Sequence, residues 1–148
     1  MLALVRGEKE SGRVVEDLAR DGAAAGERCQ VVLDATPFYG ETGGQVGDAG
    51  VIEGPDGAVF AVEDTQRSGE IFLHLGRMVR GELRTGQAVR AKVDAARRLD
   101  IARNHTATHI LHHQLRELLG PHVEQAGSLV EPGRLRLDFS HGSALSSE

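Results

Sequence analysis

The sequence is poor in aromatic residues and in cysteine. Phe, Tyr and Trp together make up 3% of the 148 residues, and Trp is absent. The core must therefore consist mainly of Leu, Val, Ile and Ala side chains. Cys29 is the only cysteine, which excludes an intrachain disulfide. No apolar run approaches the roughly 20 residues of a membrane-spanning helix, and no charged-then-apolar leader opens the chain. We therefore expect a soluble, cytoplasmic protein with no membrane partner.

An excess of positive charge is also lacking, since 17 Lys and Arg residues stand against 22 Asp and Glu residues. The formal net charge is -5 at pH 7, and the isoelectric point is near 5.8. These values give no general basic surface for nucleic acid. Any contact with RNA would depend on a local basic patch, such as one formed by Arg97, Arg98 and Arg103.

Glycine, in contrast, is abundant, with 19 residues in the chain. Residues 1–94 alternate short β-prone segments with turn formers such as Gly43-Gly44 and Thr85-Gly86. Short strands at this spacing predict that residues 1–94 form one domain, a small antiparallel β-barrel. The β-prone segments are residues 14–15, 30–33, 51–52, 59–62, 71–75 and 88–93.

The hydrophobic pattern changes near residue 95. Residues 95–119 contain no Gly or Pro, and Gly120-Pro121 follow as a typical helix stop. At about 100° per residue, this helix separates an apolar side, which we expect to be buried, from a side rich in histidine. The apolar side holds Ala107, Ile110, Leu111, Leu115 and Leu118, and the other holds Ile101, His105, Thr108, His109 and His112. Residues 123–130 and 134–139 are predicted strands, so residues 95–148 form a second part and the fold class is α+β.

His105 and His109 form an HxxxH pair on the predicted helix. Two histidines four residues apart lie on one face, where both imidazoles can reach one metal ion. Zinc accepts imidazole nitrogen and lowers the pKa of bound water towards ~7. The pattern alone fits equally a pair of packed or solvated histidines. His112 continues the face and is a candidate third ligand.

Residues 36–48 form a second notable segment, which contains Gly43, Gly44 and Gln45. A Gly-Gly pair lets the backbone approach a ligand closely, although a plain glycine-rich hairpin explains the pattern as well. Gln125 lies in a predicted strand after the helix, where a lone glutamine is usually only a solvated residue.

Taken together and in order, four segments resemble the editing domain shared by alanyl-tRNA synthetases and their free-standing trans-editing relatives. They are residues 34–48 (DATPFYGETGGQVGD), 103–112 (RNHTATHILH), 119–128 (LGPHVEQAGS) and 135–141 (LRLDFSH). The resemblance implies a translation-factor-like barrel followed by the start of an α/β zinc-binding editing domain with one long helix. It also implies hydrolysis of the ester that joins serine or glycine to the 3′ end of alanine-specific tRNA.

The resemblance further implies roles for single residues. His105 and His109 match two zinc ligands. The candidate catalytic residues are Thr108, which matches a threonine beside the amino-acid pocket, and Gln125, which matches a glutamine implicated in editing. Gly43, Gly44 and Gln45 match the glycine-rich motif of the same site, where they would contact the substrate. The implied partners are the aminoacyl end of the tRNA and the remainder of the synthetase.

The sequence departs from the family at the zinc site. The family takes two more ligands from a downstream Cys-x-x-x-His pair, whereas this sequence ends seven residues after His141. We expect a fragment whose incomplete zinc site leaves editing weak or absent in isolation. Two other hypotheses stay open: a hydrolase that completes its zinc site with His112 or in a homodimer, and a non-enzymatic tRNA- or protein-binding module built on the barrel.

Overall fold

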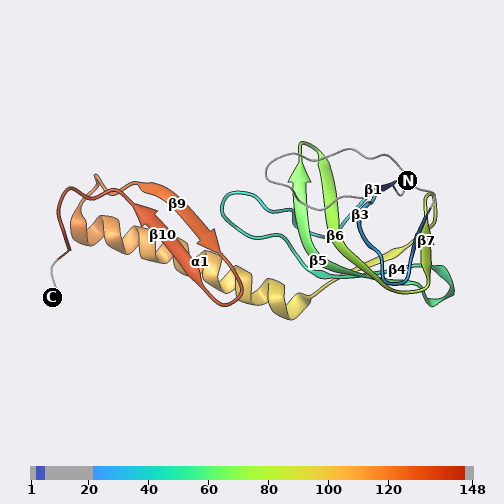
Figure 1. The fold of residues 1–148 in the computed structure, drawn as a ribbon. Helices are drawn as coiled ribbons and strands as arrows, with labels where there is room; N and C mark the ends of the chain where they lie inside the picture. Colours follow the sequence, from blue (N-terminus) through green and yellow to red (C-terminus); the bar gives the residue numbers. More distant parts are fainter. Residues whose placement is uncertain (1–2, 6–21, 146–148) are drawn as a thin grey trace. The chain divides into compact units, whose positions relative to one another are not determined.

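The computed structural model describes residues 3–5 and 22–145 (Figure 1). The contacts divide the chain into two compact units. Unit 1 comprises Met1–Thr42 and Gly47–Ala95, and unit 2 comprises Gly43–Val46 and Ala96–Glu148. The predicted strand at residues 14–15 lies outside the described residues. The domain boundary near residue 95 stays a prediction, but four residues of the glycine-rich segment belong with the later part of the chain.

Unit 1 is built on a six-stranded antiparallel sheet with the strand order β1-β3-β6-β5-β4-β8. A separate two-stranded sheet pairs β2 with β7. Among the described residues β8 does not pair back to β1, so neither sheet closes into the predicted barrel. The strands are β1 (Ala3–Val5), β2 (Gly22–Ala24), β3 (Arg28–Val32), β4 (Gly50–Glu53), β5 (Val59–Ser68), β6 (Ile71–Arg80), β7 (Glu82–Arg84) and β8 (Arg90–Val93).

The core of unit 1 comes from alternate residues of these strands. Strands β3 and β5 bury every second side chain over part of their length, because successive side chains of a strand point to opposite faces. The fully buried side chains include Val31, Ile52, Phe60, Met78 and Leu83. Cys29 is buried in the same core.

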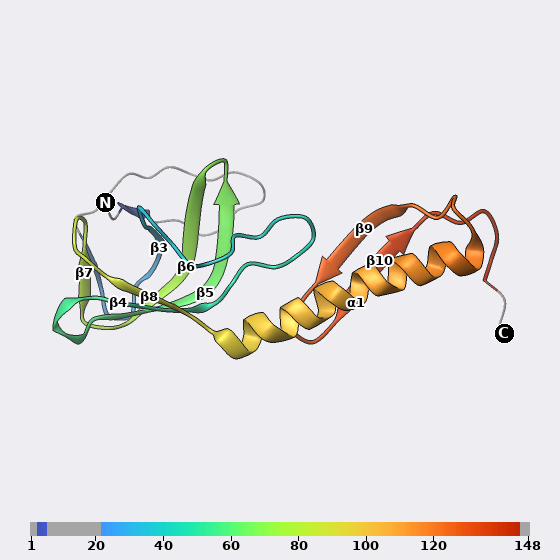
Figure 2. The same ribbon diagram turned by 180° about the vertical axis from the view of Figure 1, so that it is seen from behind.

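Unit 2 contains one helix, α1 (Ala95–Leu119), and a hairpin of β9 (Gln125–Val130) and β10 (Leu135–Phe139). The hairpin lies along the helix in both views (Figures 1 and 2). The helix ends at Leu119, and the next residue, Gly120, has a φ of 115°, which suits a residue without a side chain. The Gly120 N–H donates to the Arg116 carbonyl at 3.0 Å. The mixed α+β class with a single long helix is confirmed for the described residues. No helix among them combines the length and the apolar character that crossing a bilayer requires.

The predicted burial of the helix is wrong. Ile110 and Leu118, on the side expected to be buried, are 58% and 79% exposed. The buried helix residues are instead Ile101 and Thr108, from the opposite side. The physical reason is that the β9–β10 hairpin supplies the layer packed against α1, and it covers the side that carries these two residues.

Candidate functional site

The glycine-rich segment is a loop whose base is held in unit 1. The Tyr39 N–H donates to Asp48 Oδ2 at 2.7 Å, and the Asp48 N–H donates back to the Tyr39 carbonyl at 2.9 Å. Asp48 is 2% exposed, and its own carbonyl accepts a hydrogen bond from Thr65 Oγ1 at 2.9 Å. These contacts fix the two ends of an eight-residue loop, residues 40–47.

A buried histidine holds the residues that precede this loop. His74 is fully buried, and its Nδ1 lies 2.7 Å from the Val31 carbonyl, so Nδ1 carries the proton. Its Nε2 then accepts from Thr36 Oγ1 at 2.7 Å, and Thr36 Oγ1 accepts from the Phe38 N–H at 3.2 Å. Burial lowers the pKa of His74, which keeps the ring neutral and preserves this chain of hydrogen bonds.

The tip of the loop, Gly43–Val46, pairs with β9 inside unit 2. The Val130 N–H donates to the Gly44 carbonyl at 2.8 Å, and the Val46 N–H donates to the Val130 carbonyl at 3.2 Å. Gln45 and Val130 therefore form a parallel bridge. Gly44 has a φ of 82°, and a Cβ at this position would collide with the backbone oxygen of Ser128. The Gly-Gly pair thus permits a close backbone approach to β9, whereas the predicted approach to a ligand stays a prediction.

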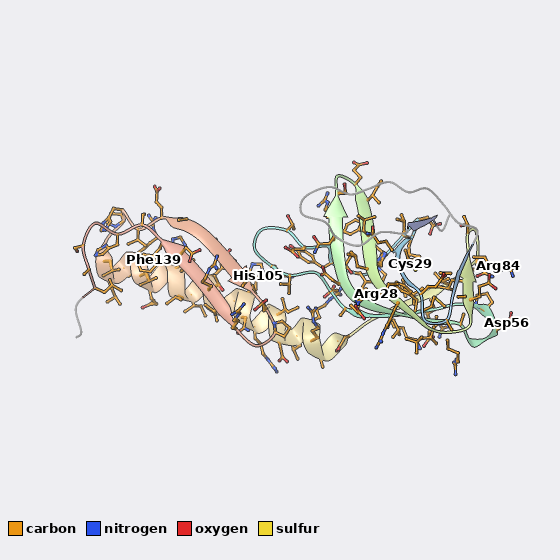
Figure 3. The ribbon with its side chains drawn as sticks, in the orientation of Figure 1. Arg28, Cys29, Asp56, Arg84, His105 and Phe139 are labelled. Atoms are coloured by element: carbon orange, nitrogen blue, oxygen red, sulfur yellow. The ribbon has the colours of Figure 1, made fainter. Side chains whose placement is uncertain are left out.

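The bridge brings Gln45 to the first histidine of the HxxxH pair. Gln45 Oε1 lies 2.6 Å from His105 Nδ1. An amide oxygen only accepts, so Nδ1 carries the proton and Nε2 keeps its lone pair. The His105 and His109 rings stack with centroids 4.9 Å apart, and both residues are exposed (His105 is labelled in Figure 3).

Asn104, which sequence reasoning missed, ties the helix to the hairpin beside His105. Its Nδ2 donates to the Glu131 carbonyl at 2.7 Å and to the Pro132 carbonyl at 3.2 Å. These bonds fix the β9–β10 turn against α1 next to the Gln45–His105 contact. The one available signal was an amide side chain within a helix, next to the HxxxH pair.

The two predicted catalytic residues lie apart from this cluster. Thr108 is 5% exposed, and its Oγ1 donates to the Asn104 carbonyl at 2.8 Å. Gln125 is exposed at the start of β9, about 16 Å from Val130 by strand rise. Its pairing with Phe139 follows a register shift in β10, and its side chain has no hydrogen bond to a described residue. The structure thus groups Gly43, Gly44, Gln45, His105 and His109, and leaves Thr108 and Gln125 outside that group.

Comparison with known proteins places the chain in a family. The family model described as tRNA synthetases class II (A) matches residues 10–97, which is more than half of the chain. The chain belongs to this family. The match includes the loop of residues 40–47 and ends before the HxxxH pair.

Relatives of this class II synthetase chain extend the match through α1, because each matched stretch covers at least 131 of the 148 residues. The chain is 51% identical over 133 residues to an alanine–tRNA ligase of Dichelobacter nodosus, covering 90% of the chain and 15% of the relative. It is 52% identical over 136 residues to the alanine–tRNA ligase of Acetivibrio thermocellus, covering 91% and 15%. That of Chloroflexus aurantiacus is 52% identical over 131 residues, covering 88% and 14%. The chain therefore spans about 15% of the length of these relatives.

The described residues of this class II synthetase chain offer only part of the ligand set for the zinc ion that the resemblance implies. His105 and His109 offer two imidazoles, whereas a structural zinc site takes four ligands. No group of three or more His, Cys, Asp or Glu side chains suited to a metal occurs in the described residues. His112, the candidate third ligand, does not join the pair, and its Nε2 is buried without a hydrogen bond in the described structure. The two histidines make half of a tetrahedral set.

Proposed function

We propose that this chain carries the front part of the editing region of an alanine–tRNA ligase, which hydrolyses the ester between serine or glycine and alanine-specific tRNA. The 2.6 Å contact between Gln45 and His105 carries the proposal, because it joins the glycine-rich loop to the HxxxH helix in one exposed cluster. The three relatives described above are alanine–tRNA ligases, which supports the choice of tRNA.

The chemistry of ester hydrolysis suits the groups in this cluster. A hydrolase must place water against the carbonyl and stabilise the oxyanion that develops. Gln45 holds His105 in the tautomer whose Nε2 lone pair can bind a metal ion, which would polarise the ester carbonyl or the attacking water. The amide N–H groups of Gln45 are oriented by the same hydrogen bond and can donate to an oxyanion.

Thr108 keeps its proposed role beside the amino-acid pocket, and Gln125 keeps its proposed role in editing. A polar group beside the amino-acid pocket would accept serine through its hydroxyl, which alanine lacks. Thr108 Oγ1 donates to the Asn104 carbonyl and keeps lone pairs that can accept from the serine hydroxyl, so this role requires only that the substrate reach the buried oxygen.

His105 and His109 stay proposed as two of the zinc ligands. We propose that the remainder of the synthetase supplies the missing ligands and most of the tRNA contacts, so that the isolated chain hydrolyses mischarged tRNA weakly. A homodimer that completes the ligand set is the alternative, and it would give strong hydrolysis together with about one bound zinc per chain.

The test is deacylation of serine-charged alanine tRNA by the purified chain, with zinc or with a chelator. We expect slow hydrolysis above the buffer rate, which His105→Gln and Gln45→Ala abolish. His113→Gln removes an exposed histidine of the same helix and should change nothing.

A binding measurement keeps the proposal testable where hydrolysis is too slow. A non-hydrolysable 3′-serylamido RNA hairpin is added, and NMR follows the Gln45 side-chain amide and the His105 ring. Shifts at both groups support editing. Shifts confined to unit 1 and unaffected by His105→Gln would overturn it in favour of a non-enzymatic binding module, and no shift together with no hydrolysis would exclude both.

A further inference from the structure

A second pair of histidines lies at the other end of unit 2. His122 follows α1 and His141 follows β10, and their rings stack with centroids 5.1 Å apart and an interplanar angle of 24°. His122 Nε2 and His141 Nδ1 are 2.9 Å apart. Neither residue has a role in the proposed editing reaction.

The backbone on both sides of this pair is fixed by Ser140. Its N–H donates to the Glu124 carbonyl at 3.0 Å, and its Oγ accepts from the Glu124 N–H at 3.1 Å. The same Oγ lies 3.3 Å from the His122 carbonyl. The two imidazoles are therefore held together by the hairpin, although both side chains are accessible to solvent.

The two inner nitrogens share one proton whichever way the outer contact of His141 runs. Its Nε2 lies 3.3 Å from Ser143 Oγ, which can accept from an Nε2–H or donate to a bare Nε2. In the first case His141 Nδ1 accepts the proton of His122 Nε2, and in the second His141 Nδ1 donates to His122 Nε2. One proton thus lies between two nitrogens that would each be a metal ligand. Histidines that bind metals commonly donate their other ring N–H to an outer partner of this kind.

We propose that His122 and His141 form a chelating site for a divalent transition-metal ion. Two imidazole nitrogens on one tetrahedral zinc lie about 3.4 Å apart, because each Zn–N bond is about 2.1 Å. The two nitrogens therefore need to separate by only about half an ångström from their 2.9 Å distance.

The proton balance of the proposed step is simple. The ion takes the place of the shared proton, which solvent transfers to the outer nitrogen of the ring that carried it, so both rings stay neutral and nothing is oxidised. A Cβ on residue 120 would lie 3.0 Å from His122 Nδ1, so Gly120 leaves room beside that nitrogen. Water fills the other coordination positions, and copper should bind more tightly than zinc, as it does at imidazole sites generally.

This site is distinct from the HxxxH pair. His105 and the end of α1 at Leu119 are separated by about 20 Å of helix, so one ion cannot bridge the two pairs. The two sites can therefore be removed independently by substitution.

Zinc titration of the purified chain tests the proposal, with calorimetry for stoichiometry and NMR for the imidazole signals. In the His105→Gln/His109→Gln variant we expect one zinc equivalent to remain and to shift the His122 and His141 signals. Loss of an outer partner of a metal ligand already weakens binding by about 10–100-fold, so His122→Gln or His141→Gln should weaken zinc binding at least tenfold. His113→Gln is the matched control and should leave the affinity unchanged.

Two outcomes would overturn the proposal. One is zinc addition that leaves the His122 and His141 signals of the unmodified chain in place. The other is a folded His122→Gln variant whose zinc affinity stays within about twofold of that of the unmodified chain. In that case the two histidines would form only a structural hydrogen bond. The first measurement needs no variant and stands even where a substitution disturbs folding. Failure of the editing assay bears on His105 and Gln45 and leaves this site untouched.

Discussion

Replacing each glycine of the Gly43-Gly44 pair by alanine should give two different results. Both residues have positive φ, 59° and 82°, so alanine costs about 1–2 kcal/mol at either position. A Cβ on Gly43 meets no atom within 4 Å, whereas a Cβ on Gly44 collides with Ser128. Gly43→Ala is therefore a matched control for backbone strain, and Gly44→Ala adds the collision.

The collision in Gly44→Ala is relieved when the loop tip moves away from β9. That movement breaks two backbone hydrogen bonds, from Val130 N–H to Gly44 and from Val46 N–H to Val130, each with a net value of about 0.5–1.5 kcal/mol. We therefore expect Gly44→Ala to destabilise the docked tip by about 1–3 kcal/mol more than Gly43→Ala does.

Amide hydrogen exchange measures this difference directly, since exchange reports the free energy of local opening. Protection of the Val130 and Val46 N–H groups should fall roughly 5- to 150-fold further in Gly44→Ala, because about 1.4 kcal/mol corresponds to a factor of ten. Equal protection of Val130 in the two variants would refute the close approach of Gly44 to β9.

Three further predictions concern His74, two residues of α1 and Gln45. Burial lowers the pKa of His74 below its ordinary 6.5, so the unfolded chain binds more protons than the folded chain below that pH. The contribution of neutral His74 to the free energy of unfolding is therefore complete above about pH 6.5 and is lost as the pH falls towards the folded pKa. Urea unfolding at several pH values measures this loss. Ile101→Ala should destabilise unit 2 by about 2–5 kcal/mol, whereas Leu118→Ala should stay within about 0.5 kcal/mol in thermal unfolding. Gln45→Ala should release the fixed tautomer of His105, which imidazole nitrogen shifts report.

Each of these predictions has a contradicting outcome. A His74→Gln variant with the same pH slope as the unmodified chain would assign that slope to other groups. Equal losses for Ile101→Ala and Leu118→Ala would mean that the apolar face of α1 is covered in solution. Unchanged nitrogen shifts of His105 in Gln45→Ala would mean that the amide does not select the tautomer.

The helix of unit 2 was predictable because local signals determine it. A long segment without Gly or Pro, followed by Gly120-Pro121, identifies a helix and its end without knowledge of its neighbours. Its buried side was not predictable, because burial depends on where the hairpin lies. The apolar pattern favoured Ile110 and Leu118, and only the packed structure shows that Ile101 and Thr108 face the covering layer.

The strands of unit 1 show the same limit. The β-branched segments around Val31 and Ile52 were recognised, but β2 and β7 were missed because their sequences, GAA and ELR, have no strong β-propensity. These two short strands exist through pairing across about 60 residues, between Gly22–Ala24 and Glu82–Arg84. The closed barrel was an extrapolation from strand spacing, which does not determine whether the last strand pairs with the first.

Part of the candidate site could be read from residue types. A Gly-Gly pair signals close backbone approach, and HxxxH signals two imidazoles on one helix face. The partner of the glycines, Val130, lies more than 80 residues away, and no local pattern identifies it. The roles of Thr108 and Gln125 stay predictions, since both depend on a bound substrate.

The assignment of Gly43–Val46 to unit 2 makes that unit discontinuous along the chain. A polypeptide of residues 96–148 expressed alone would lose the segment that pairs with the outer edge of β9, leaving the Val130 N–H without its acceptor and that edge open to other chains. Exchange of residues 1–95 between related synthetases would also disturb unit 2, because the exchanged segment contains Gly43–Val46, which belongs to unit 2. Loop and hairpin must therefore be transplanted together, and their sequences are expected to change together as synthetases diverge.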